Sequence, residues 1–163
     1  MTRATRRILV VGVVLGLVLA VAAAGGANNG NGRSYSATLS GAEEVPMVDT
    51  DASGRATFQA IKNGTLLNYQ LRVKDIEGVT QAHIHLGAPG TNGGVVAFLF
   101  GFDAEGMSGN GKLATGKITD ADLIGALSGM TIADLITQIE AGNAYVNVHT
   151  FANPGGEIRG QVG

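Results

Sequence analysis

Apolar and polar residues alternate in short runs through most of the chain after residue 33. Successive side chains of a β-strand point to opposite faces, so an alternating run predicts a strand that buries one face. Within 65–73, for example, Leu67, Leu71 and Val73 fall on the same face. The pattern predicts strands at 34–39, 55–61, 65–73, 79–86, 95–100, 112–118, 144–150 and 157–162.

The segments between these runs are rich in turn residues. Lys62-Asn63-Gly64 contains Asn-Gly, a strong signal for a tight hairpin, and 74–78 is expected to be a short loop. The run 95–100 is continuously apolar instead of alternating, which predicts a strand that is buried on both faces.

One stretch has the spacing of a helix. Between Thr131 and Glu140 the apolar residues recur three and four positions apart, and Gly142 follows as a stop signal. A second short helix is expected at 120–124, after the N-cap residue Thr119. The sequence therefore predicts an all-β fold: an antiparallel Greek-key or immunoglobulin-like β-sandwich or barrel, with one or two short helices inserted before the last hairpin.

Composition agrees with a small all-β domain. Glycine accounts for 26 of the 163 residues, so turns are expected to be frequent. The chain has no cysteine, which excludes disulfide bonds and thiolate metal sites. A chain of this length is expected to form one domain.

The N-terminus has the composition of a secretory signal peptide. Arg3, Arg6 and Arg7 precede an uninterrupted run of apolar residues and glycine at 8–24, which ends in small residues. The run is shorter than the roughly 20 residues of a membrane-spanning helix, and a retained N-terminal anchor is the alternative. We expect a secreted or cell-surface protein with a signal peptide at 1–24, a flexible Gly/Asn-rich linker at 25–33 and the β domain at 34–163.

Export would change the charge balance. The chain has 11 Lys and Arg against 13 Asp and Glu, and removing the three N-terminal arginines leaves 8 against 13, a net charge of −5. Nucleic acids need a basic patch, so an acidic domain is not expected to bind them. Membrane contact is expected only through the N-terminal segment, if that segment is retained.

The three histidines lie on two of the predicted strands. His83 and His85 are two positions apart, so they share one face of 79–86, and His149 lies on 144–150. If these two strands are antiparallel neighbours, the three imidazoles gather in one patch. Imidazoles are common ligands of zinc and copper, so the patch is a candidate metal site. The alternative is that the histidines only hydrogen-bond to loops, on the solvent side of the sheet unless a loop or helix covers them.

A fourth metal ligand would be water or a carboxylate. Glu157 is the candidate carboxylate, because the last hairpin can bring it near His149. Catalysis would also need an acid-base group, for which only Glu157, Glu43 and Glu44 are available. The sequence therefore assigns no catalytic and no cofactor-binding residue, and it favours a protein that is not an enzyme.

A series of specific motifs occurs along the predicted domain. They are SGAEEVP at 40–46, AHIHLG at 82–87, GNAYVNVHT at 142–150 and NPGGEIRGQ at 153–161. Together they resemble the CHRD domain, which is named for its occurrence in chordin and is widespread in exported microbial proteins. The resemblance covers about 34–163 and implies an extracellular β-sandwich-like domain, with no settled activity for the microbial members. Growth-factor antagonism is not implied, because the chain has one copy and no cysteine-rich modules.

The sequence leaves three hypotheses about function open. The first is a non-catalytic extracellular binding module or cell-surface structural module, whose partner is an unknown extracellular protein or envelope component. The second is a copper- or zinc-binding protein that uses the histidine patch. The placement of His83, His85 and His149 is weakly similar to that in copper/zinc superoxide dismutases, but three histidines are too few for the two metal sites of those enzymes. The third is a surface filament subunit, which would assemble through exposed edge strands.

Overall fold

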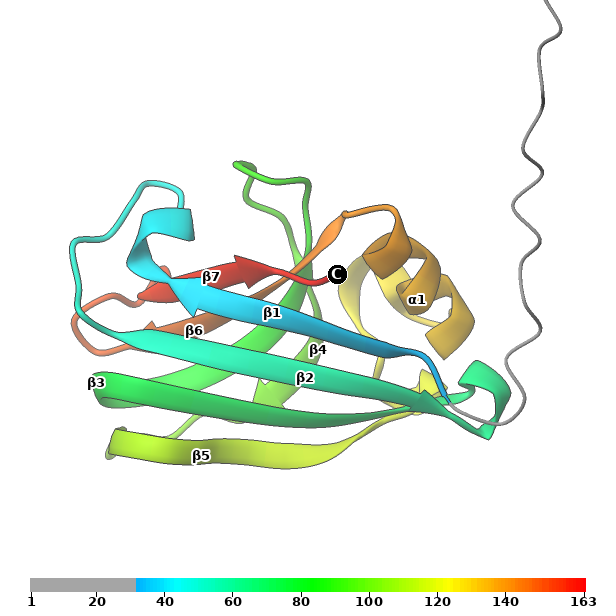
Figure 1. Cartoon of the computed structure of the whole chain (residues 1–163), viewed down its shortest axis with the longest axis horizontal. Helices are drawn as coiled ribbons and strands as arrows, with labels where there is room; N and C mark the ends of the chain where they lie inside the picture. Colours follow the sequence, from blue (N-terminus) through cyan, green and yellow to red (C-terminus); the bar gives the residue numbers. More distant parts are fainter. Residues whose placement is uncertain (1–31) are drawn as a thin grey trace, which may run out of the picture.

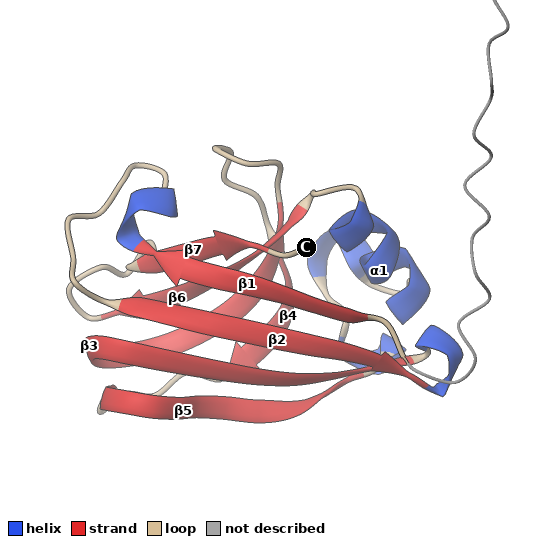
Figure 2. Cartoon of the chain, in the orientation of Figure 1, coloured by secondary structure: helices blue, strands red, loops and turns tan. Residues whose placement is uncertain are grey.

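The computed structural model describes residues 32–163, so the predicted signal peptide at 1–24 and most of the predicted linker at 25–33 lie outside the described residues. These described residues form an all-β domain with one α-helix (Figures 1 and 2). The elements are β1 (Ser34–Ser40), β2 (Ser53–Ile61), β3 (Leu66–Leu86), β4 (Val95–Phe100), β5 (Met107–Ile118), α1 (Ile132–Glu140), β6 (Ala144–Thr150) and β7 (Ile158–Gln161). Within 32–163, no helix has the length and apolar character needed to cross a membrane.

The long strand β3 organises the sheet, in which all strand pairs are antiparallel. Its first half pairs with β2 and β5, and its second half pairs with β6 and β4. β1 lies between β2 and β7, and β7 pairs with β6. The path β2–β1–β7–β6–β3 therefore returns to β2 and closes a barrel, to which β4 and β5 are added along β3 (Figure 1). The predicted all-β class is confirmed, and the Greek-key or immunoglobulin-like detail stays a prediction.

The predicted loop at 74–78 is wrong, because β3 continues through it. β5 keeps its pairing with β3 across this segment, and register shifts follow Val73 and Ile76. Asp75 and Gly78 adopt positive φ angles of 53° and 64° there. Bulges of this kind bend a strand without ending it. The turn residues in the sequence therefore mark a bend, which lets one strand serve two parts of the barrel.

The core lies inside the barrel, and α1 covers one end of it (Figure 2). The predicted helix at 131–140 is confirmed. Its N-cap residue Thr131 accepts a hydrogen bond from the backbone of Asp134, whose carboxylate accepts one from Thr131 in return. This reciprocal cap satisfies backbone donors that a helix leaves free at its start. The helix buries its apolar side chains Ile132, Leu135, Ile136 and Ile139 against the barrel.

The continuously apolar run at 95–100 forms β4, which is not buried on both faces as predicted. Among the described residues β4 pairs with β3 alone, so it is an edge strand. Val96 and Leu99 are buried, whereas Phe98 is 51% exposed. An apolar run alone does not distinguish a central strand from an edge strand, because the distinction depends on neighbours that are distant in sequence.

The second predicted helix, at 120–124, is a single 3-10 turn at Asp120–Asp122. Thr119 caps it as predicted, since the carboxylate of Asp122 accepts hydrogen bonds from the backbone and hydroxyl of Thr119. The local signal therefore located the start of a turn correctly but overestimated its length.

Candidate metal centre

The three histidines lie side by side on the outer face of β3 and β6. The two strands pair so that His83 is opposite Asn147 and His149 is opposite Gln81. His83 Nδ1 is 3.1 Å from His149 Nε2. One ligand nitrogen from each histidine, including His85, lies within 4.8 Å of the other two. The clustering predicted from the alternation is therefore present, and metal binding itself stays a prediction.

Aromatic rings and loops cover the histidine cluster, so it is not on an open solvent-facing surface. His83, His85 and His149 are only 4%, 8% and 7% exposed. The ring of Phe98 packs edge-on against His83 at 4.6 Å, and the ring of Tyr145 stacks on His85 at 4.8 Å. The cluster is thus screened from water on the side opposite the barrel core.

Two backbone carbonyl groups determine the tautomers of His85 and His149. His85 Nδ1 is 3.0 Å from the oxygen of Gly93, and His149 Nδ1 is 2.9 Å from the oxygen of Pro154. Because a carbonyl oxygen only accepts hydrogen bonds, both Nδ1 atoms carry the hydrogen and donate it. The Nε2 atom of each neutral ring then keeps its lone pair. Metal-binding histidines commonly donate their other ring N–H in this way.

The lone pair of His85 Nε2 is buried and has no hydrogen-bond partner among the described residues. An unsatisfied buried acceptor costs about 1–3 kcal/mol, which a bound cation would remove. The lone pair of His149 Nε2 instead accepts a hydrogen bond from His83 Nδ1. If the His83 hydrogen moves to its Nε2, Nδ1 becomes a third donor to a metal. The cluster therefore offers His83 Nδ1, His85 Nε2 and His149 Nε2.

Burial lowers the pKa of each histidine in the cluster. The pKa of His83 falls to about 3, first because of burial and then because His149 and His85 lie beside it. Burial is also the largest cause of the lowered pKa of His85 and of His149. All three rings are therefore neutral near pH 7, and a metal ion would not have to displace protons from imidazolium groups.

Glu157, the predicted carboxylate ligand, lies near the cluster but serves other partners. Its Oε1 accepts from Thr50 Oγ1 at 2.8 Å, and its Oε2 accepts from Thr150 Oγ1 at 2.6 Å and from Asn153 Nδ2 at 3.3 Å. Across the described residues, the only group of side chains placed to share one metal is the three histidines. A fourth ligand would therefore be water or another small molecule.

A second buried carboxylate, Glu44, lies beside the cluster on its β7 side. Both of its oxygens accept from Asn147 Nδ2 at 3.1 Å. Burial raises the pKa of Glu44 to about 7, although the charge of Arg159 and the hydrogen bond from Asn147 oppose the shift. Gly156 is necessary beside them, because a Cβ atom there would lie 2.4 Å from Asn147 Nδ2. The side chains of Asn147 and Glu44 therefore leave room only for glycine at position 156.

Arg159 holds the covering loop against the cluster, a role that the sequence did not reveal. Its Nη1 donates to Asn92 Oδ1 at 3.1 Å and its Nη2 donates to the oxygen of Thr91 at 2.8 Å. Its guanidinium carbon is 3.5 Å from the centre of the Tyr145 ring, which in turn stacks on His85. The sequence places Arg159 on a strand face but contains no local signal for acceptors in a loop almost 70 residues earlier.

The stability of the metal-free protein is expected to rise with pH between 4.5 and 6.5, the ordinary pKa values of Glu and His. The histidines have lowered pKa values, so unfolding takes up protons in this range and stability is lost as the pH falls. The raised pKa of Glu44 acts in the opposite direction, but through one group against three. We expect a slope of about 1–3 kcal/mol per pH unit, measured by urea unfolding with a chelator present.

The variant Glu44→Gln is the matched control for this slope. It removes the opposing contribution, so the dependence of the unfolding free energy on pH should become steeper. A flat or falling stability profile in the unmodified protein would contradict the assignment of three neutral buried histidines.

Comparison with known proteins identifies one relationship. A family model described as the CHRD domain matches residues 35–162, a range that includes the whole histidine cluster. This match confirms the resemblance seen in the sequence. Neither the curated proteins nor the solved structures contain a match to the chain.

Proposed function

The chain belongs to the CHRD domain family, and we propose that it is an exported, non-catalytic module of this family whose ligand is a copper or zinc ion bound by His83, His85 and His149. The observation that supports this most directly is the orphaned lone pair of His85 Nε2, buried within 4.8 Å of nitrogens of the other two histidines. Tetrahedral zinc sites hold nitrogens at 2.0–2.1 Å from the ion, which separates them by roughly 3.3 Å. Small rotations of the three rings would reach this geometry.

The donor atoms determine which ions are expected. Three imidazole nitrogens without a carboxylate are poor ligands for Mg²⁺ and Ca²⁺, which prefer oxygen. Among divalent ions that imidazole binds well, Cu²⁺ generally binds more tightly than Zn²⁺. Copper is therefore expected to displace zinc from this site.

The surroundings of the site favour binding over catalysis. A catalytic metal needs an acid-base group next to an open coordination position. The carboxylates of Glu44 and Glu157 already accept hydrogen bonds from neighbouring side chains. Phe98 and Tyr145 cover the rings of His83 and His85, which restricts the approach of a substrate. The signal-like N-terminus supports export of the module.

Metal titration of the purified, chelator-treated protein tests this function. We expect one Cu²⁺ or Zn²⁺ ion per chain at micromolar or tighter affinity, measured by calorimetry and by competition with a coloured chelator, and no binding of Ca²⁺ or Mg²⁺. At a free metal concentration about 100 times the dissociation constant, the unfolding free energy should rise by about 2.7 kcal/mol. Failure of both ions to bind at micromolar concentration would refute the proposal.

A further inference from the structure

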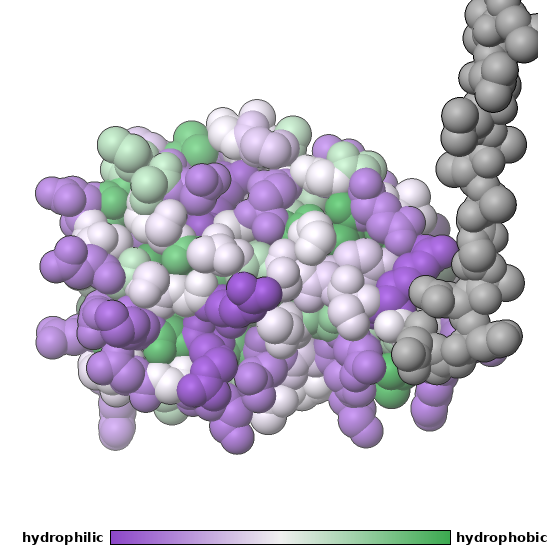
Figure 3. Space-filling view, viewed as in Figure 1, coloured by the Kyte–Doolittle hydropathy of each residue, from purple (hydrophilic) through white to green (hydrophobic). Residues whose placement is uncertain are grey.

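Figure 3 shows the side of the molecule formed by β1, β2, β3 and β5 (Figure 1), and much of its surface is hydrophilic. The part of this side that extends along β3 as far as Arg72 carries cationic and uncharged polar side chains but no acidic residue, whereas Asp75 and Glu77 follow farther along β3. We call this part the polar face. Its outward-pointing residues are Ser34, Ser36, Thr38, Arg55, Thr57, Gln59, Asn68, Gln70, Arg72, Lys112, Thr115 and Lys117. It holds four of the 8 Lys and Arg that remain without the N-terminal arginines, and none of the 13 Asp and Glu. These outward-pointing positions therefore carry positive charge only, although the domain as a whole is acidic.

Three cations lie in a row across this face. Arg55 of β2 is directly opposite Arg72 of β3, which is directly opposite Lys112 of β5. Like charges at directly opposed positions destabilise a sheet. Ion pairs among the described residues join Arg33 to Glu140 and Lys74 to Asp75, and neither neutralises the row. Local features that oppose stability tend to occur at functional sites, and an unneutralised cationic row is suited to binding anions.

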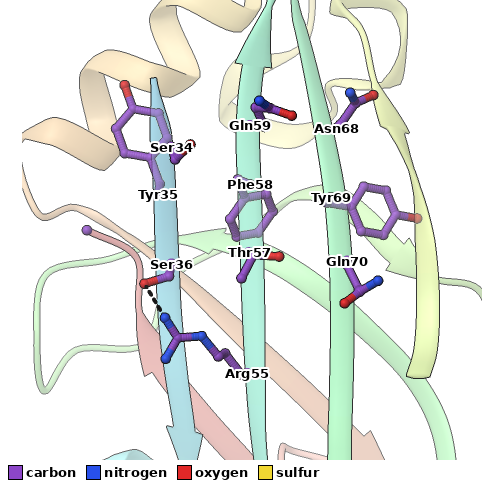
Figure 4. A pocket seen from close by; sticks show the side chains of 11 residues that line it. Ser34, Tyr35, Ser36, Arg55, Thr57, Phe58, Gln59, Asn68, Tyr69 and Gln70 are labelled. Carbon is purple, nitrogen blue, oxygen red and sulfur yellow. Dashed lines mark hydrogen bonds between the residues drawn. The ribbon is translucent and has the colours of Figure 1, made fainter. Parts of the chain in front are cut away.

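Hydroxyl and amide side chains form the next row along the strands. Ser36, Thr57, Gln70 and Thr115 are successive cross-strand partners in it. An open groove of about 530 Å³ lies over this part of the face, and Arg55, one of the three cations, lines it (Figure 4). Each hydroxyl and amide both donates and accepts hydrogen bonds, as the hydroxyl groups of a sugar do.

We propose that the polar face binds an acidic polysaccharide. The carboxylate or sulfate groups of the polysaccharide would pair with Arg55, Arg72 and Lys112. Its sugar hydroxyls would hydrogen-bond to the adjoining row of hydroxyl and amide side chains. Arginine is suited to this role, because its planar guanidinium pairs with such anions through two parallel hydrogen bonds. The cationic row spans two strand spacings, about 10 Å, which fits an extended polymer better than a small anion.

The same face is less suited to other polyanions. Single-stranded nucleic acids stack their bases on exposed aromatic side chains, and the outward-pointing residues of the polar face include none. Three aromatic residues line the groove (Figure 4), but the rings of Tyr35 and Phe58 are buried. The half-buried Tyr69 is held in place, because its hydroxyl donates to the oxygen of Leu99 at 2.7 Å. A membrane surface would also gain little, because the face presents no apolar side chain to insert. The groups present therefore match a hydroxyl-rich anionic chain.

Binding of the purified protein to defined polysaccharides tests this proposal. We expect binding to alginate, a polyuronate, or to dextran sulfate, weakening as salt is added, and no binding to uncharged dextran. Arg72→Gln should weaken that binding about tenfold, because it removes a charge-assisted bidentate contact. Its melting temperature should stay the same or rise, since the variant removes repulsion from Arg55 and Lys112. Loss of binding would then not come from unfolding.

Lys62→Gln is the matched control, because it removes one exposed positive charge from the turn between β2 and β3. Its affinity should stay within about twofold of the unmodified protein. Unchanged binding by Arg72→Gln would overturn the proposal. Equally tight binding to single-stranded DNA or to anionic phospholipid vesicles would also overturn it, since the face would then attract any polyanion.

Discussion

Replacing His149 with alanine is expected to weaken copper and zinc binding by at least about 100-fold. Loss of a partner that only orients a metal ligand already costs 10–100-fold in affinity. His149 is expected to contribute a ligand directly, because its Nε2 lies 3.1 Å from His83 Nδ1 and its Nδ1 donates to the oxygen of Pro154. The variant leaves two donors, His83 and His85, which hold an ion less firmly than three. Calorimetric titration of the unmodified protein and the variant measures the difference.

Glu157→Gln is the informative control, because the sequence suggested this residue as a fourth ligand. Its carboxylate accepts from Thr50 and Thr150, so we expect the metal affinity to change by less than about threefold. Urea unfolding of both variants would show that each is folded at the temperature of the titration. Equal loss of affinity in both would mean that the carboxylate is a ligand, and full affinity in His149→Ala would place the metal elsewhere.

Replacing Arg159 with alanine is expected to destabilise the domain by about 3–5 kcal/mol, because it removes two hydrogen bonds from a buried charged donor, each worth about 1.5–3 kcal/mol. Arg159 is 2% exposed. Its removal leaves Asn92 Oδ1 and the oxygen of Thr91 without these donors and takes away the cation on Tyr145. The buried carboxylate of Glu44 also loses the positive charge that opposes its raised pKa.

Thermal and urea unfolding measure this effect, and the melting temperature should fall by roughly 10–20 °C for a domain of this size. Arg55→Ala is the control, since Arg55 is an exposed arginine facing Arg72, and its effect should stay within about 0.5 kcal/mol. A loss below about 1 kcal/mol in Arg159→Ala would show that the covering loop does not depend on this side chain.

The two proposed sites use different parts of the domain. The metal site lies on β3 and β6, at the second half of β3, and the polar face includes the first half of the same strand. The bend at Asp75 and Gly78 separates the two halves. His149→Ala is therefore expected to retain polysaccharide binding, and Arg72→Gln to retain metal binding, so that failure of one proposal leaves the other intact.

Local patterns in the sequence predict most of the strands, the helix, and the placement of His83 and His85 on one face. Strand alternation has a period of two, so it determines which side chains share a face, and that period alone puts His83 and His85 on the same side of their strand. The reciprocal cap of Thr131 and Asp134 is equally local, and the predicted helix begins where they stand. Four short motifs also suggested the CHRD family from the sequence, and the family match over 35–162 confirms this resemblance.

Tertiary structure decided what depends on residues far apart in the chain. The pairing of β5 with β3 placed Lys112 beside Arg55 and Arg72 in one row, although a net charge of −5 gave no sign of a cationic face. Folding of the covering loops buried the histidine cluster through Gly93 and Pro154. A sequence specifies the local period and the caps directly, whereas the burial of a polar cluster and the neighbours of a charge depend on strand register and loop placement, which only packing of the whole chain determines.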